Sequence, residues 1–471
     1  MRQLRLTFPR RSMRTKIVLL CAAAIVSATT VLIGCGSSSS PQTGFVNTSI
    51  SDPAPCSAPN GPFAHIYVTV TDVKIHASSS AGPNDPGWID LTPDLKNNGP
   101  KQVDLLNEPA NECFLASLGA NTELQAGNYQ QIRIMLATDA SGLPSNGNAC
   151  KQLPGNVGNC VQMDDGTLHP LLLSSEANTG IKIPSGQIAG GQFTVGAGKT
   201  EDLDIDFNSC ASIVVQGNGQ YRLKPVLTAG EVGTNPSING TLVDSVTKQP
   251  IPNAIAVVAL ERRDSNGNDH VVMSTLADPA NGSFALCPVP GGTYDLVAAA
   301  KDGNGNLYAA TVVTGVTDGS AVGTIQLFKS GVAAASLTGN VTTSPMADDV
   351  ILAALQPIGN GVQVVTPLAD QSMATAPLST SLANCGTLCA SFTLSVPAAP
   401  PQVAAFTPGT PISGYAPAPT PNGIRYLVNG EPALLPDGTP DCTPADIYTS
   451  LVAVTPGNAS GVGTLQFTGC Q

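Results

Sequence analysis

An alternating run of carboxylates is the densest group of side chains in this sequence that could perform chemistry. It lies at 201–206 and reads EDLDID. If the run is a strand, Asp202, Asp204 and Asp206 share one face, because alternate residues of a strand point to the same side. Three hard oxygen ligands suit Ca²⁺, but a straight strand spaces them too widely to surround one ion. We therefore predict a solvated strand face whose charges discourage pairing at a sheet edge.

Two short segments have the alternating Asp and Asn spacing of a calcium-binding loop. They read DSNGN at 264–268 and DGNGN at 302–306. Neither has glycine at the sixth position, and the twelfth positions, Thr275 and Val313, offer no carboxylate. Because Asp, Asn and Gly also favour ordinary turns, we predict turns here and assign no metal and no cofactor to the chain.

The sequence contains no arrangement typical of a catalytic site. Its four histidines lack the spacing of a metal-binding pair, and there is no nucleophile-elbow or phosphate-loop motif. We therefore predict a non-catalytic protein. The alternative is an envelope hydrolase whose site is assembled from loop carboxylates that are distant in sequence.

The cysteines are predicted to form disulfides. Of the twelve, Cys21 lies in an apolar N-terminal run and Cys35 at its end, which leaves an even number for the rest of the chain. An even count favours disulfides in an exported protein. Cys150 and Cys160 flank a loop rich in Pro, Gly and Asn and are predicted to pair, whereas the pairing of the last four is left open. The disulfide candidates are Cys56, Cys113, Cys150, Cys160, Cys385, Cys389, Cys442 and Cys470.

The N-terminus has the layout of a secretory signal. A basic head precedes an apolar run over 17–31, and residues 32–35 read LIGC. Such a run is too short and too one-sided for a stable membrane span. The LIGC sequence resembles the lipobox of bacterial lipoproteins. That resemblance implies that residues 1–34 are a signal peptide, that Cys35 carries acyl chains such as palmitate, and that the membrane is reached through this lipid.

The residue after the lipid cysteine is Gly36 and not aspartate. By the same resemblance, this favours the outer membrane of a double-membraned cell, with the protein facing the periplasm or the surface. The sequence leaves open whether Met1 or Met13 is the start.

The composition describes an acidic chain with many turns. Residues 1–34 hold six of the 21 basic residues and no acidic ones, so 15 basic and 33 acidic residues remain after them, a formal charge of −18. That balance argues against nucleic acid and anionic headgroups as partners. Hydrophobic residues reach 42%, too many for a disordered chain, and 48 Gly with 39 Pro indicate the frequent turns of an all-β protein.

Alternation of apolar and polar residues predicts a first β-sandwich domain over 61–231, behind a flexible tether over 35–60. A helical period is visible only near 111–118. The order of the strand-like segments resembles the lipoprotein family called domain of unknown function 4382, which implies a fold and a location but no activity. These segments include HIYVTVTDVKIHA (65–77), GWIDL (87–91), KQVDLL (101–106), YQQIRIML (129–136), GIKIPSG (180–186), TEDLDIDF (200–207) and YRLKPVLTAG (221–230).

A second β-sandwich is predicted over 236–328. The segments INGTLVDSVTKQPIPNAIAVV (238–258), ADPANGSFAL (277–286) and VPGGTYDLVAAA (289–300) resemble the carboxypeptidase regulatory-like domain, a small sandwich of the prealbumin and carbohydrate-binding-like type. Gly240 is expected in a tight first strand, and Asn281-Gly282 is expected to be a hairpin turn. The fold serves many roles and implies no function by itself.

A third sandwich-like domain is predicted over 335–471. It begins with SLTGNV (336–341) and ends with VGTLQF (462–467), and the second domain begins with SINGTL (237–242) and ends with VGTIQLF (322–328) in a similar way. We therefore interpret the third domain as an expanded second copy of the second domain. The alternative is that short glycine-containing strands recur by chance. The extra length of the third domain is assigned to surface loops, chiefly the proline-rich stretch 397–421.

The sequence thus predicts an all-β chain of three sandwich-like modules in series, a lipid-anchored cell-envelope protein with a binding or scaffolding role. A glycan or an envelope protein is the expected partner. Two observations argue against glycan binding. Aromatic residues make up only 4% of the chain, and the single tryptophan, Trp88, is expected in the core together with Tyr294.

Overall fold

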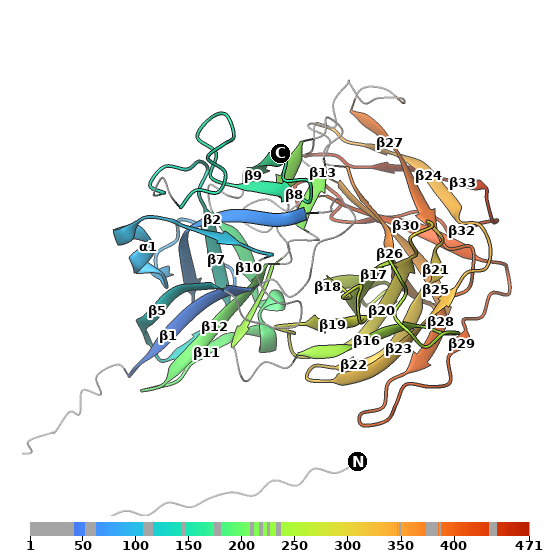
Figure 1. Cartoon of the computed structure of the whole chain (residues 1–471), viewed down its shortest axis with the longest axis horizontal. Coiled ribbons are helices and arrows are strands. Elements are labelled where there is room, and N and C mark those ends of the chain that lie inside the picture. Colours follow the sequence, from blue (N-terminus) through green and yellow to red (C-terminus); the bar gives the residue numbers. More distant parts are fainter. Residues whose placement is uncertain are drawn as a thin grey trace, which may run out of the picture. The chain divides into compact units, whose positions relative to one another are not determined.

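The computed structural model describes residues 42–51, 63–106, 116–143, 147–173, 180–207, 212–215, 220–223, 227–231, 237–345, 347, 350–373, 385, 388–432 and 440–470 (Figure 1). Over this part of the chain the fold is all-β and divided into several sheets, as predicted. No helix among these residues is long and apolar enough to cross a membrane. The predicted signal peptide and Cys35 lie outside the described residues.

The first module, residues 43–231, is a sandwich of two main sheets around one apolar core. The smaller sheet has the strand order β15-β12-β1-β5, from Leu227–Glu231, Thr200–Phe207, Thr43–Ser51 and Ala116–Gln125. The larger has the order β10-β7-β2-β8-β9-β14-β13, from Ile181–Pro184, Gln131–Leu136, Phe63–His76, Cys160–Met163, Leu168–Leu173, Tyr221–Leu223 and Ile213–Val215. The short strands β3 (Ile89–Asp90) and β4 (Lys101–Asp104) pair with β2, and β6 (Gly127–Tyr129) pairs with β11 (Phe193–Val195).

Strand β1 corrects the predicted tether. Residues 43–51 are not a flexible spacer, because they form an inner strand that pairs with β12 in parallel and with β5 antiparallel. Val46 and Ile50 of β1 are fully buried in the core of module 1. The sequence signal was weak because polar residues interrupt the apolar positions of this strand.

The helical period near 111–118 was also misread. Residues 116–118 begin the strand β5, and the rest of that segment lies outside the described residues. The α-helix that the structure does show, α1 (Pro93–Asn98), has Pro93 at its start, where a missing N–H costs little. The two described 3₁₀ helices are η2 (Ser185–Gln187) and η3 (Ala189–Gly191).

The second module, residues 238–329, is a sandwich of two sheets. One has the order β19-β16-β23-β21, from Ser283–Leu286, Ile238–Asp244, Ala321–Lys329 and Tyr308–Ala309. The other begins β18-β17-β20-β22, from Asp269–Leu276, Ile255–Arg263, Thr293–Lys301 and Thr311–Thr317. Gly240 is required in β16, since a Cβ there would lie 2.7 Å from the Gly323 oxygen and 2.9 Å from Phe284 Cζ. Gly282 has φ +73°, but the Asn281-Gly282 turn leads from one sheet to the other and is not the hairpin predicted.

The third module, residues 335–470, repeats this connectivity. Its sheets have the orders β27-β24-β33, from Cys389–Val396, Ala335–Thr342 and Ala459–Gln466, and β26-β25-β30-β31, from Val362–Ser372, Val350–Gly359, Arg425–Pro432 and Ile447–Tyr448. The strand β32 (Val452–Ala453) also pairs with β30. Gly339 in β24 occupies the place of Gly240, because it pairs in parallel with Gly463 after the same register shift, and a Cβ there would lie 2.6 Å from Phe392 Cζ.

The proline-rich stretch 397–421 is not a free loop. It contains β28 (Gln402–Ala405), which pairs in parallel with β22 of module 2, and β29 (Ala416–Pro417), which pairs with β28. Module 3 therefore extends the sheet of module 2, and the two modules share one six-stranded sheet (Figure 1). We refer to residues 397–424 as the arm.

Candidate functional site at the junction of modules 2 and 3

The aspartate row lies in β12, but its face is not the solvated face that was predicted. β12 is an inner strand, and residues Asp204 and Asp206 are each 2% exposed, whereas Asp202 is exposed. The Asp204 carboxylate accepts hydrogen bonds from the Ser49 and Ser51 hydroxyls at 3.1 and 2.6 Å. Burial raises the pKa of Asp204 to about 6, against these two bonds. The prediction failed because β1, which covers this edge, lies in the segment read as a tether.

The two Asp/Asn segments are turns, as predicted. The Asp264 carboxylate accepts two backbone N–H bonds of its own turn, at 2.8 Å each. Asp302 accepts two such bonds at 3.0 and 2.9 Å, and a third from the Lys329 ammonium at 3.0 Å. Hydrogen bonds, first that of the Asn306 side chain, hold the pKa of Asp302 below its usual value. Both carboxylates thus serve to fix the local backbone.

Six of the eight disulfide candidates lie in the described residues, and they pair among themselves. The bonds are Cys150–Cys160, Cys385–Cys389 and Cys442–Cys470, and Cys287 is also disulfide-bonded. The Cys150–Cys160 bond joins the two residues that the sequence paired and closes an irregular loop, since only Cys160 begins a strand. Cys56 and Cys113 lie outside the described residues.

The aromatic residues weighed as sugar platforms are engaged by other side chains. Trp88 is half-buried, with the His76 ring 5.1 Å from its own ring and the Arg133 guanidinium carbon 5.3 Å away. Tyr294 is 1% exposed, and its hydroxyl donates to the Pro290 carbonyl. The core position of Tyr294 is confirmed, whereas Trp88 lies at the edge of module 1 and not in its core.

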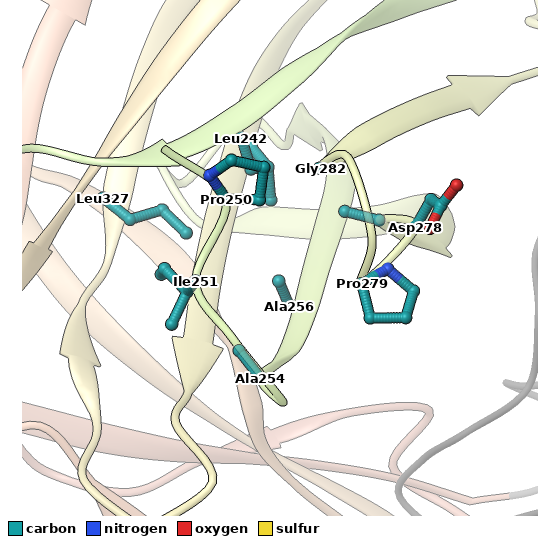
Figure 2. A pocket seen from close by; sticks show the side chains of 10 residues that line it. Leu242, Pro250, Ile251, Ala254, Ala256, Asp278, Pro279, Gly282 and Leu327 are labelled. Carbon is teal, nitrogen blue, oxygen red and sulfur yellow. The ribbon is translucent and has the colours of Figure 1, made fainter. Parts of the chain in front are cut away.

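A shallow apolar depression lies at one end of the module 2 sandwich. Its volume is about 260 Å³, a figure that includes solvent at its open mouth. Figure 2 shows Pro250, Ile251 and Ala254 on one side, and the Asp278 carboxylate turned away from the centre. Because ligand pockets enclose about 300–1,000 Å³ and present polar groups to the ligand, this depression is a poor ligand site.

The most unusual chemistry lies where modules 2 and 3 meet. Strand β26 packs against the outer face of β17, β18 and β20 (Figure 1). Val297, Val312 and Val364 are fully buried and form the apolar centre of this contact. Beside them, the Gln363 N–H donates to the Gly267 carbonyl oxygen at 2.9 Å. We call this contact the junction.

Three carboxyl groups are buried at the junction, and the partly exposed Arg263 is the cation that contacts two of them. Glu261 is 0%, Asp269 1% and Asp295 8% exposed. Arg263 donates to Asp269 at 3.0 Å and also to Asp295, while Glu261 Oε2 accepts the N–H of Val365 in β26 at 2.9 Å. One cation thus faces three acids, and a buried carboxylate without a countercharge is costly.

Burial and mutual repulsion raise the pKa values of two of these acids. Burial, followed by the charge of Asp269, raises the pKa of Glu261 well above its usual value, against the Val365 N–H bond. Burial likewise raises the pKa of Asp269 to about 7, with Arg263 opposing and Asp295 adding to the effect. Protonation removes the uncompensated charge, so both carboxyl groups are held largely neutral in mild acid.

His270 of module 2 lies at the rim of the junction and contacts side chains of module 3. His270 Nδ1 lies 3.1 Å from Glu431 Oε1, and Nε2 lies 3.1 Å from the Tyr448 hydroxyl and 3.6 Å from Asp264. The Glu431 contact, and after it the charge of Asp264, raises the pKa of His270, against its burial. Burial also raises the pKa of Tyr448, which makes the phenol a poor nucleophile at neutral pH. This arrangement binds a proton well and is poorly suited to covalent catalysis.

The junction was not predicted from the sequence, although two of its buried acids stand out there. Glu261 and Asp295 stand in the apolar strands IAVVALERR and TYDLVAAAK, where charged residues are rarely buried without a partner. A carboxylate inside such a run indicates a buried polar contact. The contacts of the junction could not be found from the sequence, since Glu261 and Val365 are 104 residues apart and His270 and Glu431 are 161 residues apart.

Residues 43–225 match the family model described as Domain of unknown function (DUF4382). The match begins at β1, which agrees with the place of that strand in the module 1 sheet and not with the predicted start at 61. It covers module 1 and less than half of the chain. No curated protein matches the sequence.

Three solved structures illustrate the remaining resemblances. The Bacillus anthracis TIE protein is 9% identical over 91% of this chain and 51% of its own, with a TM-score of 0.16. Shaft pilin SpaA from Lactobacillus rhamnosus GG is 13% identical over 62% of this chain and 98% of its own, with a TM-score of 0.19. The minor pilin of Streptococcus agalactiae is 9% identical over 50% of this chain and 96% of its own, with a TM-score of 0.15. This chain spans about half the length of the first. TM-scores this low carry no conclusion about this chain.

Proposed function

We propose that the chain is a non-catalytic, lipid-anchored protein of the cell envelope in which modules 2 and 3, joined by a shared sheet, form one scaffold that presents a binding surface. The observation that carries this proposal is the shared sheet. β28 of the arm pairs with β22, and Ala404 and Ile412 of the arm are buried in the core of module 2. Such a connection restricts bending between the modules far more than a flexible linker would.

The binding surface that we propose is the outer face of the sheet β27-β24-β33. These three strands contain no charged residue, in a chain with a formal charge of −12. Ser391, Thr393 and Ser395 of β27 are exposed, and Thr393 stands opposite Thr338 of β24. Their hydroxyl groups can donate and accept hydrogen bonds, as a neutral glycan requires. An uncharged surface also avoids the repulsion that the rest of this acidic chain would exert on an anionic polymer.

The test exposes the lipid-free full chain to isolated envelope glycans and measures both retained protein and released reducing ends. We expect retention without release. Thr393→Ala combined with Ser395→Ala should lower retention several-fold, since surface substitutions of this kind change stability by less than about 0.5 kcal/mol. Thr241→Ala, on the corresponding sheet of module 2, is the matched control.

Two results would decide against parts of the proposal. Release of reducing ends would favour the alternative, an envelope hydrolase with loop carboxylates. Equal retention of the parent and the double variant would leave a scaffold that binds through another surface.

A further inference from the structure

We propose that the junction is a proton-operated latch, in which module 3 is hinged on module 2 through β28 and is held closed at the β17–β18 edge by protonated Glu261, Asp269 and His270. The two attachments lie on opposite sides of one sheet, because its order β18-β17-β20-β22-β28-β29 places β18 at one edge and the arm at the other. The inference goes beyond the proposed function and does not depend on a lipid or a glycan.

The hinge side is held by bonds that do not titrate. The Gln402 and Phe406 N–H groups donate to the carbonyl oxygens of Ala310 and Thr314 at 2.8 and 2.9 Å. Tyr415 of the arm packs its ring 5.4 Å from that of Phe328 in β23. These are backbone and apolar contacts, so the hinge is expected to keep its strength over the ordinary pH range.

The latch side is held by groups that do titrate. Glu261 from β17 bonds directly to the β26 backbone, while Asp269 from β18 and Asp295 from β20 lie close enough to repel it. Arg263 is the cation among them. On the rim, His270 faces Glu431 of β30, the Asp264 turn and Tyr448 of β31, and Asp446 lies near Tyr448. β26 supplies the backbone N–H groups of Gln363 and Val365.

The direction of the pH effect follows from counting charge. When Glu261 and Asp269 are neutral, Arg263 balances Asp295, and protonated His270 partly balances Asp264 and Glu431. When all three latch groups lose their protons, the buried cluster gains two negative charges and the rim loses its positive one. Because opening the junction returns these carboxylates to water, high pH favours the open form.

The pKa shifts predict the same direction of the pH effect as the charge count. The pKa values of Glu261, Asp269 and His270 are all raised in the structure, first by burial for the two acids and first by the Glu431 contact for His270. If opening exposes these groups to water, their pKa values fall towards the ordinary ones, so the closed form of the proposed latch binds protons more tightly than the open form. Closure is therefore favoured in mild acid and weakens as pH rises through about 7, the value for Asp269. The apolar centre of Val297, Val312 and Val364 opposes opening at every pH.

Hydrogen exchange of the full chain tests the latch, with rates corrected for the intrinsic effect of pH. The amides of Gln363 and Val365 report the latch, and those of Gln402 and Phe406 report the hinge. We expect protection over 362–366 to fall about tenfold between about pH 5.5 and about pH 8, while protection over 402–406 stays constant. Constant protection at both places, or an equal loss at both, would overturn the proposal.

Glu261→Gln separates charge from geometry. The amide keeps an oxygen for the Val365 N–H but cannot ionise, so most of the pH dependence over 362–366 should disappear. Asp269→Asn is the second variant, in case the first fails to fold, and Asp302→Asn, an aspartate in a turn outside the junction, is the matched control. If both latch variants retained the full pH dependence of the parent, the assignment of the latch groups would be wrong.

Discussion

Asp204 should make the stability of module 1 fall as pH rises. It is 2% exposed, and its pKa is raised by burial from the ordinary 3.8 to about 6. The folded state therefore binds this proton more tightly than the unfolded state. Stability is greatest below about pH 4 and is lost as pH rises through about 6. At about 1.4 kcal/mol per pH unit, the whole loss is about 3 kcal/mol, of which about 1–2 kcal/mol falls between about pH 5 and about pH 7.5.

The single tryptophan makes this loss measurable in the full chain. Trp88 lies in module 1, so urea unfolding followed by its fluorescence reports that module alone. We expect the parent to lose stability over this pH range and Asp204→Asn to lose almost none, because the amide cannot ionise. Its oxygen can accept from one of the Ser49 and Ser51 hydroxyls, and its NH2 group can donate to the other hydroxyl oxygen.

Asp202→Asn is the matched control, since Asp202 lies on the same strand but is exposed. It should keep the pH dependence of the parent. The reasoning would be refuted if the parent were equally stable at both pH values, or if Asp204→Asn lost as much stability as the parent.

Three further predictions concern the anchor, the arm and a disulfide. Cys35→Ser should move the protein from the membrane to the soluble fraction. If the serine variant stays in the membrane after a high-salt wash, the lipid anchor is contradicted. Ile412→Ala should destabilise module 2 by about 2–4 kcal/mol, seen as faster hydrogen exchange in β22 but not in β24; equal changes in both would contradict the arm's place in the module 2 core. Replacing Cys150 and Cys160 by serine should lower the stability read by Trp88 by about 2–3 kcal/mol, and an unchanged urea midpoint would argue against that estimate.

The sequence was most informative where one strand face is polar and the other apolar. The alternation in 65–77 and 200–207 correctly predicted two strands, β2 and β12, because the apolar residues of each lie in the core. It failed for β1, whose polar residues Ser49 and Ser51 are buried as hydrogen-bond donors to Asp204. From one sequence alone, a polar residue that is buried against a polar partner cannot be told from one that faces solvent. Here Asp204 lies about 150 residues from Ser49 and Ser51.

The candidate site was beyond the sequence for a related reason. Its carboxylates belong to one module and the groups that bury them belong to another, so no local pattern contains both. The similar first strands of modules 2 and 3 were visible as SINGTL and SLTGNV, because Gly240 and Gly339 are each fixed by a neighbouring carbonyl and a phenylalanine ring. The orientation of the two copies is set instead by the arm, and the arm read as a loop because prolines dominate its composition.

The arm also explains why residues 236–328, which look like a complete domain in the sequence, are not an independent one. In module 2 the connection between β19 and β20 is short, whereas the matching connection in module 3, between β27 and β30, contains the arm. Without it, β22 would be an open strand edge. An uncovered strand edge invites pairing with other chains. The long connection in module 3 therefore covers the β22 edge of module 2, and module 2 depends on module 3 for that protection.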